Sequence, residues 1–271
     1  MDDLTLQLYD NLRNSYFGKY RAIVVDNIDP QKRGRVKLTI PSILGTEETD
    51  WALPCFPFGG AKQYGFYMVP EIGSRVWVEF EEGNLSYPIW IGSFWHLEEE
   101  VPSELTEDKP TTRLLKTPSE HSLLFEDAED KERICLKHKS GAHLDMDSEG
   151  SLELTDSGGS IIRLDAENSE LHIEDKNGNK IAMTSQGTTI EDSNGNKVEM
   201  GASGINVKGN QIVIEGQQVS LAGAGGEPLI KGQSFLQLYM AHTHPSAAGP
   251  TGPPIPTGAE MTSLSSKVKS A

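Results

Sequence analysis

The residues whose types and spacing most favour a chemical role are two histidines, His242 and His244, which flank Thr243. In an extended segment, residues two positions apart lie on one side of the backbone, so both imidazoles face the same way. Imidazole is a ligand of iron, zinc, copper and nickel. Two ligands per chain do not complete a site, but three copies around an axis supply an octahedral set. The alternatives are surface or turn histidines, or a Pro-rich tail that packs without metal.

Acidic residues are the other candidates for chemistry. Glu79, Glu81 and Glu82 could be read as paired carboxylates of the glycosidase kind, but their place at a strand end and hairpin turn favours a solvated turn. Four aspartates near Gly-rich turns match no calcium-binding loop; they are Asp145, Asp147, Asp156 and Asp165. The sequence also lacks nucleophile-elbow, zinc-protease and phosphate-loop motifs. We therefore predict no catalytic residues and no enzyme activity.

The net charge of the chain is strongly negative. Its 271 residues include 40 Asp and Glu against 24 Lys and Arg, a formal net charge of −16. Such a field repels phosphate backbones and anionic lipid, so we expect no nucleic-acid partner. One cluster of basic residues is an exception to this negative charge. Two interpretations of it remain open: it docks on an acidic surface, or it is a solvated strand end. It comprises Lys32, Arg33, Arg35 and Lys37.

The cysteines and the N-terminal residues give no sign of export. Cys55 and Cys135 form no CxxC pair or disulfide framework, and we expect two buried or idle thiols. The N-terminal residues lack a secretory signal, and no apolar run reaches the length of a transmembrane helix. We expect a chain that is made in the cytoplasm and leaves only as part of a larger particle.

The second half of the chain contains a repeat that shortens along the sequence. Apolar pairs begin at Ile181, Ile190, Val198, Ile205, Ile212 and Val219, and an Asn-Gly-Asn-Lys sequence occurs at 177–180 and 194–197. Each unit predicts a short strand followed by a turn. One unit cannot bury its own apolar face, so units must stack on their neighbours. The shortening predicts a rod that tapers.

Period-2 alternation places the apolar residues of each unit on one strand face. Leu152 and Leu154 share a face, for example, while Glu153 faces water. The earlier units lie at 123–125, 133–138, 142–146, 152–154, 161–164 and 171–173. About two apolar residues per strand make too thin a core for one chain, so we expect a homo-oligomer. Three intertwined chains allow three such faces to meet on one axis, which predicts a homotrimer.

The patterns divide the chain into five parts of an all-β fold. Residues 1–18 contain a predicted docking helix at 3–14, and residues 19–96 form a small five-stranded barrel. The predicted strands of the barrel lie at 20–27, 35–40, 51–53, 75–80 and 89–94. Residues 97–118 are an acidic, Pro-containing linker, and residues 119–230 form the rod. Residues 231–271 form a Pro/Gly-rich tip segment that begins with a short helix at 235–240.

Residues 19–96 resemble the OB-fold of the central spike proteins of contractile phage tails, the baseplate assembly protein V-like family. The resemblance extends to the valine–glycine repeat spikes of type VI secretion. It rests on DPQKRGRVKL at 29–38, WALP at 51–54, PFGG at 57–60, GFY at 65–67, PEIGSRVWVEF at 70–80, PIW at 88–90 and GSFW at 92–95. The rod is similar in architecture rather than in motif to the trimeric, triple-stranded β-helix of that family.

The resemblance implies a function. Spikes of this family dock through the OB domain on a trimeric baseplate hub, and sheath contraction drives them through the target outer membrane. A separate tip protein is a further possible partner, and the location is the virion tail. Some short phage spikes hold an iron ion through a His-x-His motif near the apex, so the resemblance implies iron at His242 and His244. The 97–118 segment is too short for the lysozyme domain of T-even spikes, so we predict no muramidase activity.

Two other functions remain as alternatives. A β-helical, tailspike-like polysaccharide depolymerase needs a long solenoid with a catalytic groove, and these repeats are short and thin. An OB-fold that binds single-stranded nucleic acid uses basic patches with aromatic side chains, and the net charge opposes that role.

Overall fold

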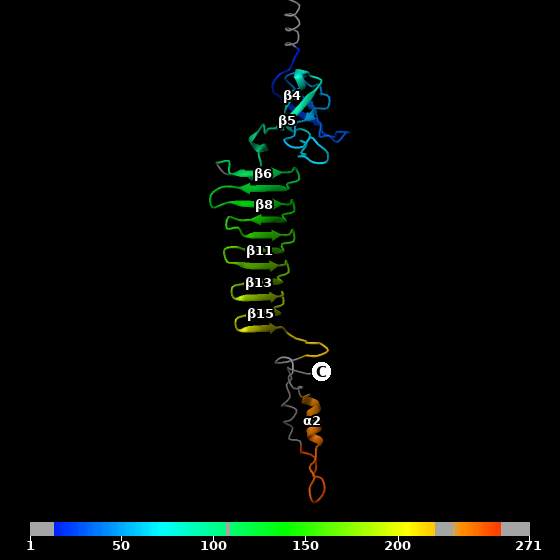
Figure 1. Cartoon of the computed structure of the whole chain (residues 1–271), viewed down its shortest axis with the longest axis vertical. Helices are drawn as coiled ribbons and strands as arrows, with labels where there is room; N and C mark the ends of the chain where they lie inside the picture. Colours follow the sequence, from blue (N-terminus) through cyan, green and yellow to red (C-terminus); the bar gives the residue numbers. More distant parts are fainter. Residues whose placement is uncertain (1–13, 107–108, 220–229, 231, 256–271) are drawn as a thin grey trace, which may run out of the picture. The chain divides into compact units, whose positions relative to one another are not determined.

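The computed structural model describes residues 14–106, 109–219, 230 and 232–255 (Figure 1). The chain divides into two compact units, 1–206 and 207–271, and each part is described by itself. The described residues are almost entirely β-strands and turns, with one α-helix and two short 3-10 turns, which confirms the all-β prediction. Apart from residue 14, the helix predicted at 3–14 lies outside the described residues.

Five short strands build the N-terminal barrel. They are β1(Tyr20–Asp26), β2(Lys37–Thr39), β3(Leu53–Pro54), β4(Arg75–Phe80) and β5(Pro88–Ser93). Their order in the sheet is β2-β1-β4-β5-β3, with β3 parallel to β5 and the other pairs antiparallel. An isolated bridge between Val36 and Ala52 joins the two ends of this order and closes the barrel. The strands lie close to their predicted positions.

Strict alternation along the strands fills the barrel interior. In β4, Val76, Val78 and Phe80 are buried, while the residues between them are only partly buried. The same period directs the small and branched side chains of β1 and β2 inward. The buried cluster comprises Ala22, Val24, Val36, Leu38, Ile40, Ala52, Val76, Val78, Phe80 and Trp90. The barrel therefore has a hydrophobic core that is complete within one chain.

An eleven-stranded antiparallel sheet follows, in which each strand pairs with the next along the chain (Figure 1). Its strands are β6(Thr112–Lys116), β7(Ser122–Glu126), β8(Arg133–Lys137), β9(His143–Met146), β10(Leu152–Thr155), β11(Ile161–Asp165), β12(Glu170–Glu174), β13(Lys180–Thr184), β14(Gly187–Glu191), β15(Lys197–Gly201) and β16(Gly204–Lys208). A single chain thus supplies one sheet of stacked strands. The intertwining of three chains concerns the assembly and stays a prediction.

The turns alternate between the two edges of this sheet. One edge has turns of constant length, at 117–121, 138–142, 156–160, 175–179 and 192–196. The turns at the other edge shorten along the chain; they lie at 127–132, 147–151, 166–169, 185–186 and 202–203. The loss of loop residues at one edge shortens the repeat of two strands along the chain from β7 to β14.

The constant turns share one hydrogen-bonding scheme. In the turn that begins at Asp175, the Oδ1 atom accepts the amide protons of Asn177 and Asn179, each at 2.9 Å. The fourth residue, Gly178, has φ of +88° and donates its amide to the carbonyl of Asp175. Asp156 and Asp192 begin turns of the same design. A short acceptor side chain and a left-handed fourth residue therefore fix this turn.

Two domain predictions need correction. Strand β6 lies inside the predicted 97–118 linker, because each residue of 112–116 pairs with a residue of β7. The 3-10 turn η2(Glu98–Glu100) also lies there, and the Nζ atom of Lys116 pairs with Glu104 at 2.6 Å. At the other end, the strand predicted at Ile212 does not form, because the described residues 209–219 contain none. The strand predicted from Val219 onward lies largely outside the described residues. A strand needs a hydrogen-bonded neighbour, and β16 is the last strand of the sheet among the residues that the structure describes.

The second unit contains the helix α2(Gly232–Ala241), which confirms the short helix predicted at 235–240. No helix in the described part of the chain is long and apolar enough to cross a lipid bilayer.

Candidate functional site: an uncovered sheet face and a histidine pair

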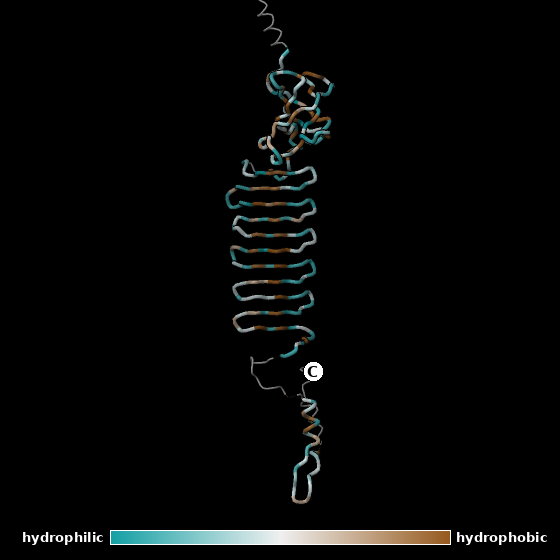
Figure 2. Tube along the Cα trace, turned by 45° about the vertical axis from the view of Figure 1, so that its right-hand side comes forward, coloured by the Kyte–Doolittle hydropathy of each residue, from teal (hydrophilic) through white to brown (hydrophobic). Residues whose placement is uncertain are grey.

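The register of the sheet aligns apolar side chains into two columns on one face. Facing pairs such as Leu136 and Leu144, or Ile173 and Ile181, repeat from strand to strand. The first column is Leu115, Leu123, Leu136, Leu144, Leu154, Ile162, Ile173, Ile181, Ile190 and Val198. The second is Phe125, Ile134, Met146, Leu152, Leu164, Leu171, Met183, Thr188 and Met200. Figure 2 shows this hydrophobic band across the strand centres, with hydrophilic turns at both edges. We call this surface the apolar face.

No element of the described chain covers the apolar face. Leu136 is 55% exposed, and Leu154 and Leu164 are 47% and 48% exposed. A contiguous apolar surface of this extent is rare on a protein that works as a monomer, and it marks an interface. Because its side chains come from the whole length of the sheet, the interface must be equally long.

The opposite face of the same sheet carries charged side chains that form ion pairs with one another. The Arg133 Nε atom lies 2.6 Å from Asp145, whose side chain is only 20% exposed. Arg163 lies 3.6 Å from both Glu153 and Asp165. Cross-strand pairs of this kind suit a face in contact with water. In an isolated chain, several charged side chains of this sheet are thus less exposed than the apolar ones. A fold that is stable as a single chain has the opposite distribution, with its apolar side chains buried and its charged side chains exposed.

The histidine pair lies directly after α2. The imidazole rings of His242 and His244 are 5.0 Å apart, measured between their centroids, and nearly perpendicular. The His242 Nδ1 atom bonds to the backbone carbonyl of Tyr239. A carbonyl oxygen only accepts, so Nδ1 carries the proton of this bond, and in the neutral imidazole Nε2 is then the nitrogen with the lone pair.

The segment after the histidines folds into a closed loop. The amide of His244 donates to the Thr251 Oγ1 atom, and the amide of Thr251 donates to the His244 carbonyl, both at 2.8 Å. Within this loop, Ser246 and Gly249 exchange two backbone hydrogen bonds. The Pro/Gly-rich sequence thus returns the chain to the backbone of His244.

The donor set of one chain supplies two of the six ligands that an octahedral metal site requires. Among the described residues, no group of three His, Cys, Asp or Glu side chains could hold a metal ion. His242 and His244 still offer what an imidazole site requires, because their rings are adjacent and the Tyr239 carbonyl holds the ring of His242 through its Nδ1 atom. Further copies of the chain must complete any such site.

Two of the four cations of the basic cluster, Arg35 and Lys37, make contacts within the barrel. Arg35 pairs with the buried Asp29 at 2.6 Å. This hydrogen bond, together with the backbone amides of the 29–35 loop, holds the pKa of Asp29 well below its usual range. Arg35 and Lys37 also lie over the Trp51 ring, at 5.5 and 5.4 Å from its centroid. Arg21 covers Trp77 in the same way, at 5.7 Å. Since these cations already occupy the ring faces, the surface is a poor platform for stacking bases.

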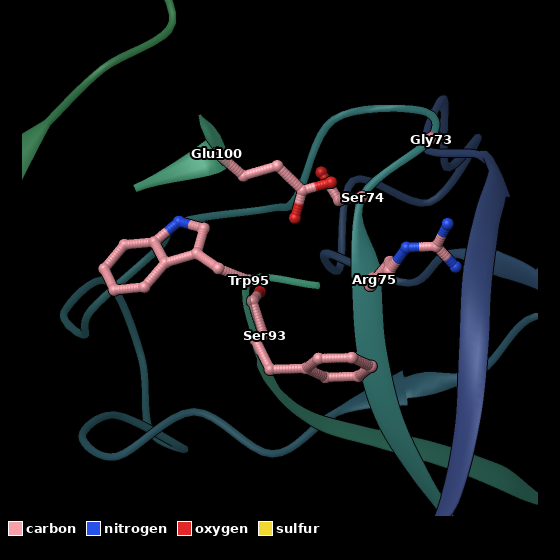
Figure 3. A pocket seen from close by; sticks show the side chains of 7 residues that line it. Gly73, Ser74, Arg75, Ser93, Trp95 and Glu100 are labelled. Atoms are coloured by element: carbon pink, nitrogen blue, oxygen red, sulfur yellow. The ribbon is translucent and has the colours of Figure 1, made fainter. Parts of the chain in front are cut away.

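A small cavity in the barrel region contains the best candidate for acid–base chemistry (Figure 3). It measures about 350 Å³ and is lined by Gly73, Ser74, Arg75, Ser93, Phe94, Trp95 and Glu100. The Glu100 carboxylate points toward Ser74, and the Arg75 guanidinium extends away from it. Glu100 accepts the amides of His96 and Leu97, which lower its pKa. This single, firmly ionised carboxylate does not supply the acid and base of a hydrolase.

The remaining candidates have structural roles. Glu79 pairs with Lys19 at 2.6 Å, and the exposed Glu81 and Glu82 lie in the turn η1(Glu81–Gly83), as the solvated-turn interpretation predicts. Of the four aspartates, Asp145 pairs with Arg133, and the others accept backbone amides in turns. Both cysteines are free thiols; Cys135 is buried, which raises its pKa, whereas Cys55 is exposed.

Two supports of the histidine pair escaped the sequence analysis. Neither the Tyr239 carbonyl nor the Thr251 hydroxyl belongs to a recognisable motif. The signal that could have pointed to Thr251 is its position in the run of Pro and Gly, where a turn that folds back needs a partner.

Comparisons with known proteins place the barrel in a family. Residues 20–95 match the family described as the type VI secretion system/phage-baseplate injector OB domain. Over 131 residues, 45% of the chain, the sequence is 34% identical to the actin cross-linking toxin VgrG1 of Vibrio cholerae serotype O1. Over 81 residues, 28% of the chain, it is 36% identical to the type VI secretion system spike protein VgrG5 of Pseudomonas aeruginosa. These alignments span 11% and 10% of the two relatives.

Proposed function

Because residues 20–95 match the injector OB domain of type VI secretion systems and phage baseplates, we propose that the chain is a structural, membrane-piercing central spike. The observation that supports this proposal is the apolar face, which runs along the whole sheet and has no cover within the described chain. A spike must be stiff and narrow, and burial of such a face between copies produces a stiff rod.

Three copies of the chain assemble side by side in this proposal. Each sheet forms one wall, the apolar faces meet on the axis, and the charged faces contact water. The hydrophobic effect then drives assembly in proportion to the apolar area removed from water. Beyond β16, the copies intertwine, and Ile212 and Val213, which are 52% and 64% exposed in one chain, gain strand partners there.

The partners follow from the family. The barrel docks on a trimeric hub, and sheath contraction drives the rod through the target outer membrane. The location is a contractile tail or secretion apparatus, after assembly in the cytoplasm. The role is mechanical, without catalysis and without nucleic-acid binding. The cations that cover Trp51 and Trp77 and the net charge of −16 support the last point.

The histidine pair serves as a metal-binding tip in this proposal. His242 and His244 of three copies hold an iron ion on the axis, and the bound ion supplies a cross-link between the three chains. The support for this role is the adjacency of the two rings and the lone pair that His242 presents at Nε2.

Light scattering coupled to size exclusion, with metal analysis of the same peak, tests both parts. We expect a mass of three chains, where one chain is 29.7 kDa, and about one iron per trimer. A monomer contradicts the spike. A trimer without iron keeps the spike and overturns the metal-binding tip. The double variant His242→Ala/His244→Ala should lose iron and keep the mass of the trimer.

A further inference from the structure

Helix α2 holds the ring of His242 from two sides. Its last turn accepts the Nδ1 proton through the Tyr239 carbonyl, and the Tyr239 ring packs on the imidazole with centroids 5.0 Å apart. Phe235, one turn earlier, stacks on Tyr239 at 6.4 Å with an interplanar angle of 26°. Residues three and four apart share one side of a helix, so the three rings form a single ladder. The ladder restricts the ring rotation of His242, and the carbonyl selects its tautomer.

His244 is held by a different device. Thr251 donates to its carbonyl and accepts its amide proton, which closes the 244–251 loop. The backbone of His244 is therefore fixed relative to its own loop, while that of His242 is fixed relative to the helix.

We infer that Tyr239 and Thr251 are the positioning residues of the metal site, and that His242 binds its metal through Nε2. This inference rests on the proposed metal-binding tip. Helix α2 orients one imidazole of each copy, and the Pro/Gly-rich loop orients the other. Removing a group that holds a metal ligand in its orientation typically lowers metal affinity by about 10–100-fold.

Paired variants of the full chain test the inference. Thr251→Val removes the hydroxyl at nearly constant shape, and Thr251→Ser retains it. Tyr239→Ala removes the stacked ring, and Tyr239→Phe retains it. Ferrous iron alone is the probe, with its affinity measured by anaerobic competition against a chelator. We expect Thr251→Val and Tyr239→Ala to bind iron about 10–100-fold more weakly, and Thr251→Ser and Tyr239→Phe to match the parent.

A second measurement reports the ligand atom. Raman marker bands of imidazole distinguish metal bound through Nε2 from metal bound through Nδ1, and the difference between the parent and His242→Ala isolates His242. Bands of the Nε2-bound form support the inference, and bands of the Nδ1-bound form overturn it. Light scattering of each variant verifies that the trimer is intact, so weaker binding is not a consequence of lost assembly.

The outcomes separate the inference from the function it rests on. A parent trimer that takes up no iron refutes the metal-binding tip and the inference with it, and leaves the spike. A parent that binds iron while Thr251→Val and Tyr239→Ala bind it equally well refutes the inference alone.

Discussion

The barrel and the sheet are both built from short, alternating strands, yet only the barrel has an interior. In the barrel, Leu38, Val76 and Val78 are fully buried within one chain. In the sheet, the equivalent inward-directed residues, such as Leu154 and Ile190, are 47% and 45% exposed. Alternation creates an apolar face in both regions, but only a closed sheet covers that face by itself. The same local pattern therefore produces an independent domain in one region and an incomplete one in the other.

The largest expected effect comes from a charge on the apolar face. Ile190→Asp places a carboxylate from each of three copies into the interface, where an unpaired buried charge costs several kcal/mol. We expect complete loss of the trimer in light scattering. The control is Thr189→Asp, which changes the neighbouring residue on the opposite, charged face and should leave the trimer intact. A normal trimer of Ile190→Asp contradicts the assignment of this face to the interface.

A cavity in the barrel should have a smaller and local effect. Leu38→Ala removes a fully buried side chain and should lower the free energy of unfolding of the barrel by about 2–5 kcal/mol. All four tryptophans lie between residues 51 and 95, so their fluorescence reports the barrel separately from the sheet. We expect an earlier fluorescence transition with an unchanged trimer mass. Dissociation of the trimer by this substitution would show that the two regions do not fold independently.

A backbone substitution sharpens the comparison inside the sheet. Gly187 has φ of +140°, and an added Cβ would lie 1.9 Å from the Met200 carbonyl oxygen of the neighbouring strand. Gly187→Ala must therefore displace the hairpin at 185–186. Gly150→Ala meets no atom within 4 Å and should cost only the left-handed conformation, about 1–2 kcal/mol. Thermal unfolding by circular dichroism should rank Gly187→Ala as the less stable; the reverse order would contradict the tight hairpin.

The smallest expected effect is a response of the turns to acid. Hydrogen bonds from Asn179 and from backbone amides lower the pKa of Asp175 from 3.8 to about 2. Because the folded-state pKa is below the unfolded one, this contribution to stability is complete above pH 3.8 and is lost as the pH falls toward 2. Asp175→Ala should lower the melting temperature near neutral pH and approach the parent near pH 2. A constant difference at all pH values contradicts the linkage.

Much of this architecture could be predicted from the sequence because it depends on local rules. Period-2 alternation located the barrel strands within a few residues, and it placed Leu152 and Leu154 on one face with Glu153 on the other. The turn chemistry of Asp175 and Gly178 is equally local. The prediction missed β6, since its residues follow a stretch of charges and prolines, and it placed a strand at Ile212, where the described chain offers no neighbour.

The sequence by itself determined that this protein has strands with one apolar side and a pair of adjacent histidines, because spacing and residue type are properties of the chain alone. Only the tertiary structure decided which apolar sides are covered. It closed the barrel through the bridge of Val36 to Ala52, and it left the apolar face of the sheet open. It also brought the Thr251 hydroxyl to His244 and the Tyr239 carbonyl to His242. Burial and the hydrogen bonds that support the two histidines join residues that no local pattern relates, so they appear only once the chain has folded.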